Sequence, residues 1–323
     1  MIPRRSLLAA PLAVPLLARP ARAQGWAPER PLRLVIPLAP GGTADTLGRI
    51  IAEPLGAALG QPVIIENRPG GATSIAAIAV ARAAPDGLTM LYAVPSVQII
   101  NPHLVKNMTY DAMGDFAPLI ALMRAPKLLV VRTGLPVQDV AELIALAKSQ
   151  PGGPSYASSG VFSSGHLAGA MFAQMAGIEL LHVPFRGTAP AAQELMAGRV
   201  DMAFDTIATL LPLVREGRMR ALAVSTTEPA AAAPELPPIA RTLPGYYDAS
   251  FNYLLVPART PPEAIARLNA ELNKILASPT VRARFATLGV EPLGGTPEWL
   301  GAEVQSESDR WKRVIQVGGL QTE

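Results

Sequence analysis

The sequence predicts an α/β protein of two lobes, each built on a mainly parallel sheet. Short apolar segments typical of buried strands alternate with helical patterns, which favours parallel strands joined by right-handed crossovers. The 323-residue chain is also longer than one hydrophobic core usually holds. A segment rich in alanine and proline, residues 227–246, indicates a crossing between the lobes.

The first 23 residues are predicted to be a secretory signal peptide. Arg4 and Arg5 precede an apolar run of 13 residues from Ser6 to Ala18, and the small residues that follow place cleavage after Ala23. This run is too short to span a bilayer. The paired arginines also fit twin-arginine export, although an ordinary basic leader is the preferred interpretation. We therefore expect a soluble periplasmic protein.

Removal of this leader changes the charge of the chain. The full sequence has 28 Lys and Arg against 25 Asp and Glu, and four arginines leave with the leader, so the balance becomes 24 against 25, or −1. Nucleic acid and anionic membranes are therefore not expected partners. The absence of cysteine excludes disulfides and thiolate metal sites, and the three histidines lack metal-binding spacing. We expect no metal and no cofactor.

The elements of the first lobe follow in order from the apolar periodicity. Strands are predicted at 32–38, 62–67 and 88–93. Helices are predicted at 43–59 and 73–84, and Pro54 should kink the first of them because proline lacks an N–H donor.

The second lobe repeats this alternation. Strands are predicted at 127–131, 155–160, 179–183, 199–204 and 220–225, and helices at 137–149, 163–177 and 189–196. Thr260 and Glu263 form a predicted capping box before another helix, and a last helix covers 297–317. We assign 24–125 and about 247–296 to the first lobe, and 126–246 and about 297–323 to the second.

Each lobe contains a loop that leads from a strand into a helix through glycine and a hydroxyl residue. The first loop comprises Pro40, Gly41, Gly42, Thr43, Ala44 and Asp45. The second comprises Ser158, Gly160, Ser163, Ser164 and His166. The first N–H groups of a helix have no internal acceptor, and the helix dipole favours anions there. Two such helix starts predict a site that clamps an acid, or both ends of a diacid, between the lobes.

Several longer motifs carry a family resemblance over essentially the whole chain after the leader. They are Pro40-Gly41-Gly42-Thr43-Ala44-Asp45, Asn67-Arg68-Pro69-Gly70-Gly71, Ala84-Pro85-Asp86-Gly87, Ile100-Asn101-Pro102, Asp115-Phe116-Ala117-Pro118, Ser163-Ser164-Gly165-His166-Leu167-Ala168-Gly169, His182-Val183-Pro184-Phe185-Arg186-Gly187 and Asp201-Met202-Ala203-Phe204-Asp205. With these motifs the chain resembles the substrate-binding proteins of tripartite tricarboxylate transporters, the Bug-type solute receptors. The resemblance implies a type II periplasmic-binding-protein fold with a ligand cleft between the lobes. It also implies a receptor that holds a small organic carboxylate through backbone N–H groups and ordered waters, with the membrane subunits of a tripartite transporter as partners. We expect the receptor to be a monomer.

The chain departs from the family pattern at three places. Thr43 and Ala44 stand in the order opposite to the usual Ala-Thr, and Arg186 stands where lysine is usual. The polar run that usually follows the third strand is replaced by the more apolar segment 93–98, which contains Ser96 and Val97. We expect Val94, Pro95 and Val97 to form an apolar wall of the pocket.

Four ionisable side chains near these motifs have competing interpretations. If Asp45 touched an acidic ligand, the two carboxylates would lie about 4 Å apart and repel by roughly 4 kcal/mol at an effective dielectric of 20. Capping of the helix is therefore the preferred role of Asp45. A structural role is slightly preferred for Asp205. For His166 and Arg186, ligand binding and a structural or solvated role remain equally open.

An enzyme is the competing class of function. Ser164, His166 and Asp205 have the composition of a hydrolase triad, but side chains two positions apart on a helix do not face each other. Nucleophile-elbow, metal and phosphate-loop motifs are absent from the sequence. A receptor that feeds a membrane sensor kinase would have the same fold and site, so that alternative stays open.

Overall fold

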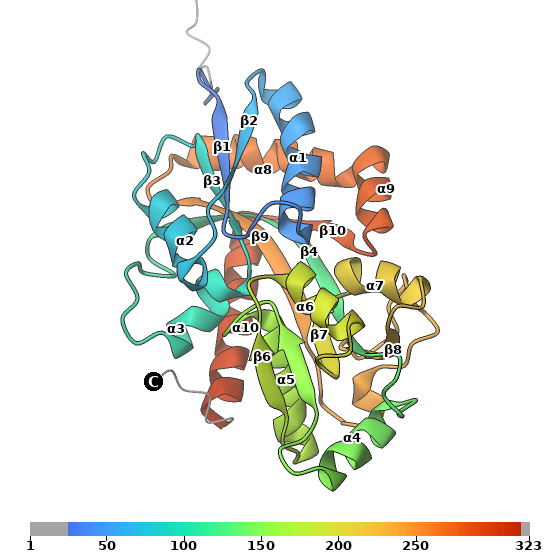
Figure 1. The fold of residues 1–323 in the computed structure, drawn as a ribbon. Coiled ribbons are helices and arrows are strands. Elements are labelled where there is room, and N and C mark those ends of the chain that lie inside the picture. Colours follow the sequence, from blue (N-terminus) through green and yellow to red (C-terminus); the bar gives the residue numbers. More distant parts are fainter. Residues whose placement is uncertain (1–24, 318–323) are drawn as a thin grey trace, which may run out of the picture.

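One long strand, β4 (Phe116–Val131), takes part in the sheets of both lobes. The structure is a computed structural model that describes residues 25–317, and it shows two α/β lobes connected through β4 and β9 (Ala249–Pro257) (Figure 1). The predicted signal peptide, residues 1–23, lies outside the described residues. Among the helices described, none is both long and apolar enough to cross a bilayer.

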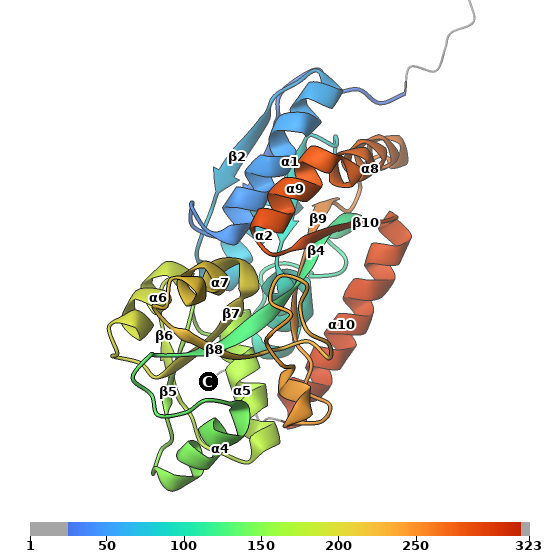
Figure 2. The same ribbon diagram turned by 90° about the vertical axis from the view of Figure 1, so that its right-hand side faces the viewer.

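The first lobe has the strand order β2-β1-β3-β9-β4, with helices on both faces of this sheet (Figure 2). Its other strands are β1 (Leu32–Ile36), β2 (Val63–Asn67), β3 (Thr89–Ala93) and β10 (Glu291–Gly294). Its helices are α1 (Thr43–Leu59), α2 (Ser74–Ala81), α8 (Pro262–Ala277) and α9 (Pro279–Thr287). After β3 the chain forms a π turn, η2 (Ser96–Ile100), and the short helix α3 (Asn101–Leu104).

The second lobe continues the strand order as β4-β7-β5-β6, and β8 pairs with β4 as well. Its strands are β5 (Ser155–Ser158), β6 (Leu181–Pro184), β7 (Met202–Thr206) and β8 (Arg220–Val224). Its helices are α4 (Val140–Ser149), α5 (Ser164–Ala176), α6 (Thr188–Met196) and α7 (Ile207–Arg215). Aromatic side chains, including Phe172, Phe204 and Tyr246, fill the core between its sheet and helices.

The predicted α/β class is confirmed, and the sheet is mixed. The pairs β1–β2, β1–β3, β5–β6 and β5–β7 are parallel, as strand-helix alternation requires. Strands β4 and β9 pair antiparallel with each other and with their other neighbours. The antiparallel pairs therefore lie where the chain passes between the lobes.

The bounds of helix α1 agree with the prediction because both of its ends are encoded locally. Gly42 is extended at the N-cap, and Gly60 adopts the left-handed conformation (φ 72°) that ends the helix. The helix runs through Pro54 without interruption. The bounds of helix α10 (Pro297–Val317) also agree with the prediction.

The predicted capping box before α8 is wrong. Pro261 is the N-cap residue, and no side chain caps the helix. The Thr260 hydroxyl is buried without a hydrogen-bond partner, while its N–H donates to the Pro257 carbonyl at 3.0 Å. The two prolines that follow shift the helix start by one residue, so that the hydroxyl no longer reaches the free N–H groups.

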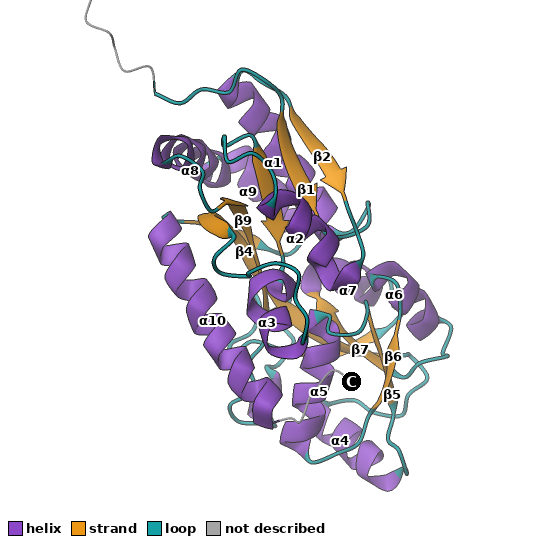
Figure 3. Ribbon diagram, turned by 90° about the vertical axis from the view of Figure 1, so that its left-hand side faces the viewer, coloured by secondary structure: helices purple, strands orange, loops and turns teal. Residues whose placement is uncertain are grey.

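Helix α10 lies against segments that the sequence analysis placed in the first lobe (Figure 3). Ser308 is 2.8 Å from Nε2 of His103 in α3, and Glu303 accepts a hydrogen bond of 2.5 Å from Arg124 in β4. These contacts are with the first lobe, and the assignment of 297–323 to the second lobe stays a prediction. The division of the remaining chain into lobes stays a prediction.

Candidate functional site

The first loop is held in shape by Asp45. The Gly41 N–H donates to Oδ2 of this carboxylate at 3.0 Å, and Arg49 donates to both of its oxygens at 3.1 and 3.0 Å. Burial raises the pKa of Asp45, but the hydrogen bonds from Arg49 and Gly41 outweigh it and bring the pKa below its ordinary value. Asp45 is therefore an ionised anchor of the loop, in line with the capping interpretation.

The backbone of this loop is open to a ligand where it enters α1. Pro40, Gly41 and Gly42 are exposed, and Gly41 has a φ of 85°. The first helical hydrogen bond joins the Thr46 N–H to the Gly42 carbonyl, so the N–H groups of Thr43 and Ala44 precede it. A Cβ built on Gly42 would meet only the Ala39 carbonyl, at 3.9 Å. This helix start can therefore donate to an anion.

The second loop presents the start of α5 in the same way. Ser163 caps the helix by accepting from the His166 N–H at 3.3 Å, and its own N–H donates to the Gly160 carbonyl. The N–H groups of Ser164 and Gly165 precede the first helical bond. A Cβ on Gly165 would lie 2.4 Å from the Phe204 carbonyl, so this position requires glycine.

A stack of aromatic rings borders the second loop. The imidazoles of His166 and His182 lie 3.8 Å apart and nearly parallel, and Tyr156 packs against both. Nδ1 of His166 accepts from the Phe162 N–H at 3.0 Å, which leaves the proton of the neutral ring on Nε2. His182 Nε2 is 2.7 Å from the Ser158 hydroxyl. The stack thus offers one fixed Nε2–H donor beside the helix start.

The sequence analysis did not select Tyr156 and His182 as site residues. They are directly paired across β5 and β6, which places both side chains on one face of the sheet. The register of the two strands would have revealed the pair.

Acid should destabilise the protein through this stack. Burial lowers the pKa of His166, and burial together with the neighbouring His166 lowers that of His182 to about 4. The unfolded chain, with an ordinary histidine pKa near 6.5, then binds more protons than the folded one. This histidine contribution to stability is fully present above pH 6.5 and is lost as the pH falls toward 4.

We therefore expect the melting temperature of the wild-type protein to fall more steeply between pH 6.5 and 4 than that of a His182→Gln variant. Thermal unfolding followed by circular dichroism at half-unit intervals measures the difference. Parallel curves for the two proteins would contradict the neutral stack.

Asp205 lies at the end of β7 and is held by threonines. Its carboxylate accepts from the Thr206 N–H at 2.7 Å and from the Thr188 hydroxyl at 2.8 Å. Burial raises its pKa, although these two bonds and the charge of Lys127 act in the opposite direction. These contacts agree with the structural role preferred for Asp205.

The remaining predicted residues lie apart from these contacts. Arg186 is exposed, and no ion pair involves it among residues 25–317. Ser96 is half-buried at the start of η2. Val97 is fully buried in the core, and its carbonyl accepts from Tyr110 at 2.7 Å. The π turn directs Val97 inward, so its side chain does not line an open wall as predicted. Val94 and Pro95 are also buried.

The two lobes meet beside the first loop. The hydroxyls of Thr43, at the start of α1, and Thr209, in α7, are 3.1 Å apart. A surface cavity of about 320 Å³ lies elsewhere, between Trp26 and α8, and no residue of either loop lines it. Within the described chain, no group of three or more metal-ligating side chains is placed to hold a metal ion.

A model of the tripartite tricarboxylate transporter family receptors matches residues 47–320. The chain belongs to this family. Three solved structures are similar to the receptor over most of its length. Rpa4515 of R. palustris, solved with adipate, is 37% identical with a TM-score of 0.87 over 90% of this chain and 98% of its own.

The periplasmic binding protein BugD is 30% identical, with a TM-score of 0.85 over 91% of this chain and all of its own. MatC of Rhodopseudomonas palustris, solved with bound malate, is 32% identical, with a TM-score of 0.83 over 89% of this chain and 99% of its own. These structures confirm the predicted fold. Membership of the family implies a periplasmic solute-binding receptor.

The receptor's contacts do not assemble the hydrolase triad considered from the sequence. His166 Nδ1 is occupied by the Phe162 N–H, and Asp205 is occupied by Thr188 and Thr206. Neither residue is hydrogen-bonded to the Ser164 side chain in the described structure.

Proposed function

We propose that this receptor captures an organic dicarboxylate between the starts of α1 and α5 and delivers it to the membrane subunits of a tripartite transporter. The observation that carries the proposal is the pair of helix starts, one per lobe. Each presents backbone N–H groups that have no acceptor within its helix, and each is reached through a glycine loop. Helix starts favour anions, and two of them suit a ligand with two negative ends.

Two similar receptors support the chemical class of the ligand. Rpa4515 was solved with adipate and MatC with malate, and both molecules are dicarboxylates. In our proposal one carboxylate accepts from the N–H groups of Thr43 and Ala44, and the other from those of Ser164 and Gly165. The Nε2–H of His166 adds a neutral donor near the second helix start. Arg186 is an exposed cation of the same lobe that favours the approach of an acid.

A ligand that binds only the folded receptor should raise its melting temperature. At 100 times the dissociation constant the gain in stability is about 2.7 kcal/mol, or roughly 5–10 °C for a protein of this size. Thermal-shift screening of di-, tri- and aromatic carboxylates, with sugars as the control class, tests the proposal. A flat response to every acid together with a clear shift by a sugar would contradict it.

Among dicarboxylates we expect adipate to bind at least tenfold more tightly than malate. Burying about 60 Å² of a methylene chain contributes about 1.5 kcal/mol, which is about a tenfold change in affinity. Malate has a shorter and more polar body than adipate, so it offers less apolar surface for burial between the lobes. Calorimetric titration of both acids under one buffer condition decides this preference. Tighter binding of malate would show that the pocket does not bury the methylene chain of the ligand.

A further inference from the structure

A line of hydroxyl groups runs from the second lobe to the first. The Thr206 hydroxyl lies 3.0 Å from that of Thr209, and the Thr209 hydroxyl lies 3.1 Å from that of Thr43. Thr206 is the N-cap residue of α7 and Thr209 lies in its first turn, whereas Thr43 is the first residue of α1. The line therefore ends on a residue of the first ligand loop.

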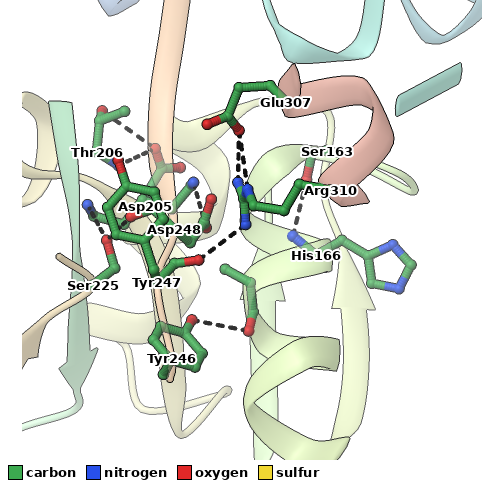
Figure 4. Close-up of polar contacts among 12 residues, drawn as sticks. Ser163, His166, Asp205, Thr206, Ser225, Tyr246, Tyr247, Asp248, Glu307 and Arg310 are labelled. Carbon is green, nitrogen blue, oxygen red and sulfur yellow. Dashed lines mark hydrogen bonds and ion pairs between the residues drawn. The ribbon is translucent and has the colours of Figure 1, made fainter. Parts of the chain in front are cut away.

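The second-lobe end of this line is firmly positioned. The Asp205 carboxylate accepts hydrogen bonds from the Thr206 N–H and the Thr188 hydroxyl, so it connects β7 with α6. Figure 4 shows the contact of Asp205 with Thr206. Helix α7 buries Ile207, Leu210 and Leu211 against the core. Thr209 is thus carried by a rigid part of the second lobe, and its distance to Thr43 depends on how the two lobes stand to each other.

We propose that Thr209 is a positioning residue that favours the closed arrangement of the lobes by holding Thr43, and so sets the affinity for any ligand bound between them. The first part of this inference is independent of the ligand, and the effect on affinity rests on the proposed function. A bond that exists in one arrangement only shifts the population toward that arrangement. Ligands that require the closed arrangement then bind more tightly in proportion to the closed fraction, and this factor is the same for every such ligand whatever its chemistry.

The size of the effect follows from the kind of bond. One hydrogen bond between neutral groups changes an equilibrium by roughly fivefold. Thr209→Val keeps the branched shape and removes the hydroxyl, whereas Thr209→Ser keeps the hydroxyl. Thr226→Val is the matched control, because the Thr226 hydroxyl donates to the Glu228 carbonyl within the second lobe.

The arrangement of the lobes can be measured without any ligand. The chain has no cysteine, so the substitutions Ala145→Cys in α4 and Ala283→Cys in α9 introduce two labelling sites, one per lobe, at exposed positions. Spin-label distances in the ligand-free protein should show a short, closed population. Thr209→Val should lower its ratio to the open population roughly fivefold, while Thr209→Ser and Thr226→Val should leave it unchanged. An unchanged distribution in Thr209→Val, or the absence of a closed population in the wild type, would overturn the proposal.

The affinity readout separates a positioning role from a ligand contact. With adipate and malate as probes, Thr209→Val should weaken binding by one common factor, up to about fivefold, for whichever acids bind. The loss should appear mainly as faster dissociation, since the ligand leaves only when the lobes open. A loss that differs between the acids would mean that Thr209 touches the ligand and would overturn its positioning role. If neither acid binds, the proposed function fails, and the ligand-free distances still decide the role of Thr209.

Discussion

Replacement of Lys127 by methionine should lower the free energy of unfolding by about 3–5 kcal/mol, because it leaves a buried carboxylate without its partner. The Lys127 ammonium lies 2.5 Å from Oδ2 of Asp248, and both side chains are only 1% exposed. A buried carboxylate that loses its counter-charge must either stay charged at high cost or take up a proton. Urea unfolding at pH 7 measures the change.

The matched variants make this result specific. The double variant Lys127→Met, Asp248→Leu removes both charges and should recover most of the lost stability, since an apolar pair can replace a buried ion pair. Arg30→Met breaks an exposed pair with Asp86, in which Arg30 is 70% exposed, and should change stability by less than about 1 kcal/mol. A loss below about 1 kcal/mol in Lys127→Met would show that this ion pair does not stabilise the fold as we expect.

The position of this ion pair explains why its loss should lower the stability of the whole fold. Lys127 lies on β4, and its N–H donates to the Ser225 hydroxyl at 2.7 Å. The N–H of Ser225 donates to the Lys127 carbonyl, and that of Asp248 donates to the Ser225 carbonyl. Figure 4 shows Ser225 and Asp248 beside Asp205 and Thr206 at the end of β7. These bonds join β4, the end of β8 and the approach to β9, where the chain passes between the lobes.

Gly42→Val should reduce affinity for the bound carboxylate by at least about tenfold while the protein remains folded. The new side chain has room within the protein, since its Cβ would meet only the Ala39 carbonyl at 3.9 Å. It would, however, stand over the exposed backbone that we expect the carboxylate to contact. Calorimetric titration gives the affinity, and far-ultraviolet circular dichroism verifies the fold.

Two further glycine variants delimit this effect. Gly134→Val alters an exposed glycine of the second lobe outside both loops and should leave affinity unchanged. Gly165→Ala would place a Cβ 2.4 Å from a backbone oxygen and should instead impair folding. A folded Gly42→Val protein with wild-type affinity would mean that the first loop is only a turn.

Local signals sufficed for the elements that frame the site. Glycines at both ends define α1, and the two strand-loop-helix segments appear where the sequence places them. The prolines Pro118 and Pro126 obscured the long strand β4, because proline normally argues against a strand interior. Strand β9 was missed, and its partners are distant in sequence.

The sequence analysis also missed side-chain contacts between distant segments, because local patterns do not report on partners far away in the sequence. The bond between Thr43 and Thr209 joins residues 166 positions apart, and local periodicity carries no information about it. Val97 shows the opposite error, a ligand contact that was predicted and that the structure does not show. Its apolar character suggested a pocket wall, but the π turn directs it into the core, and burial in the core is the commoner fate of such a residue.

Native mass spectrometry of the gently purified receptor tests the central claim most directly. If the starts of α1 and α5 clamp a dicarboxylate, the folded protein should carry a small mass that is released on denaturation and identified as an organic acid, and added adipate should restore the complex after its removal. The same complex should be weakened in Gly42→Val. A released molecule that is a sugar or another uncharged solute, with no complex formed on addition of any carboxylate, would contradict the account.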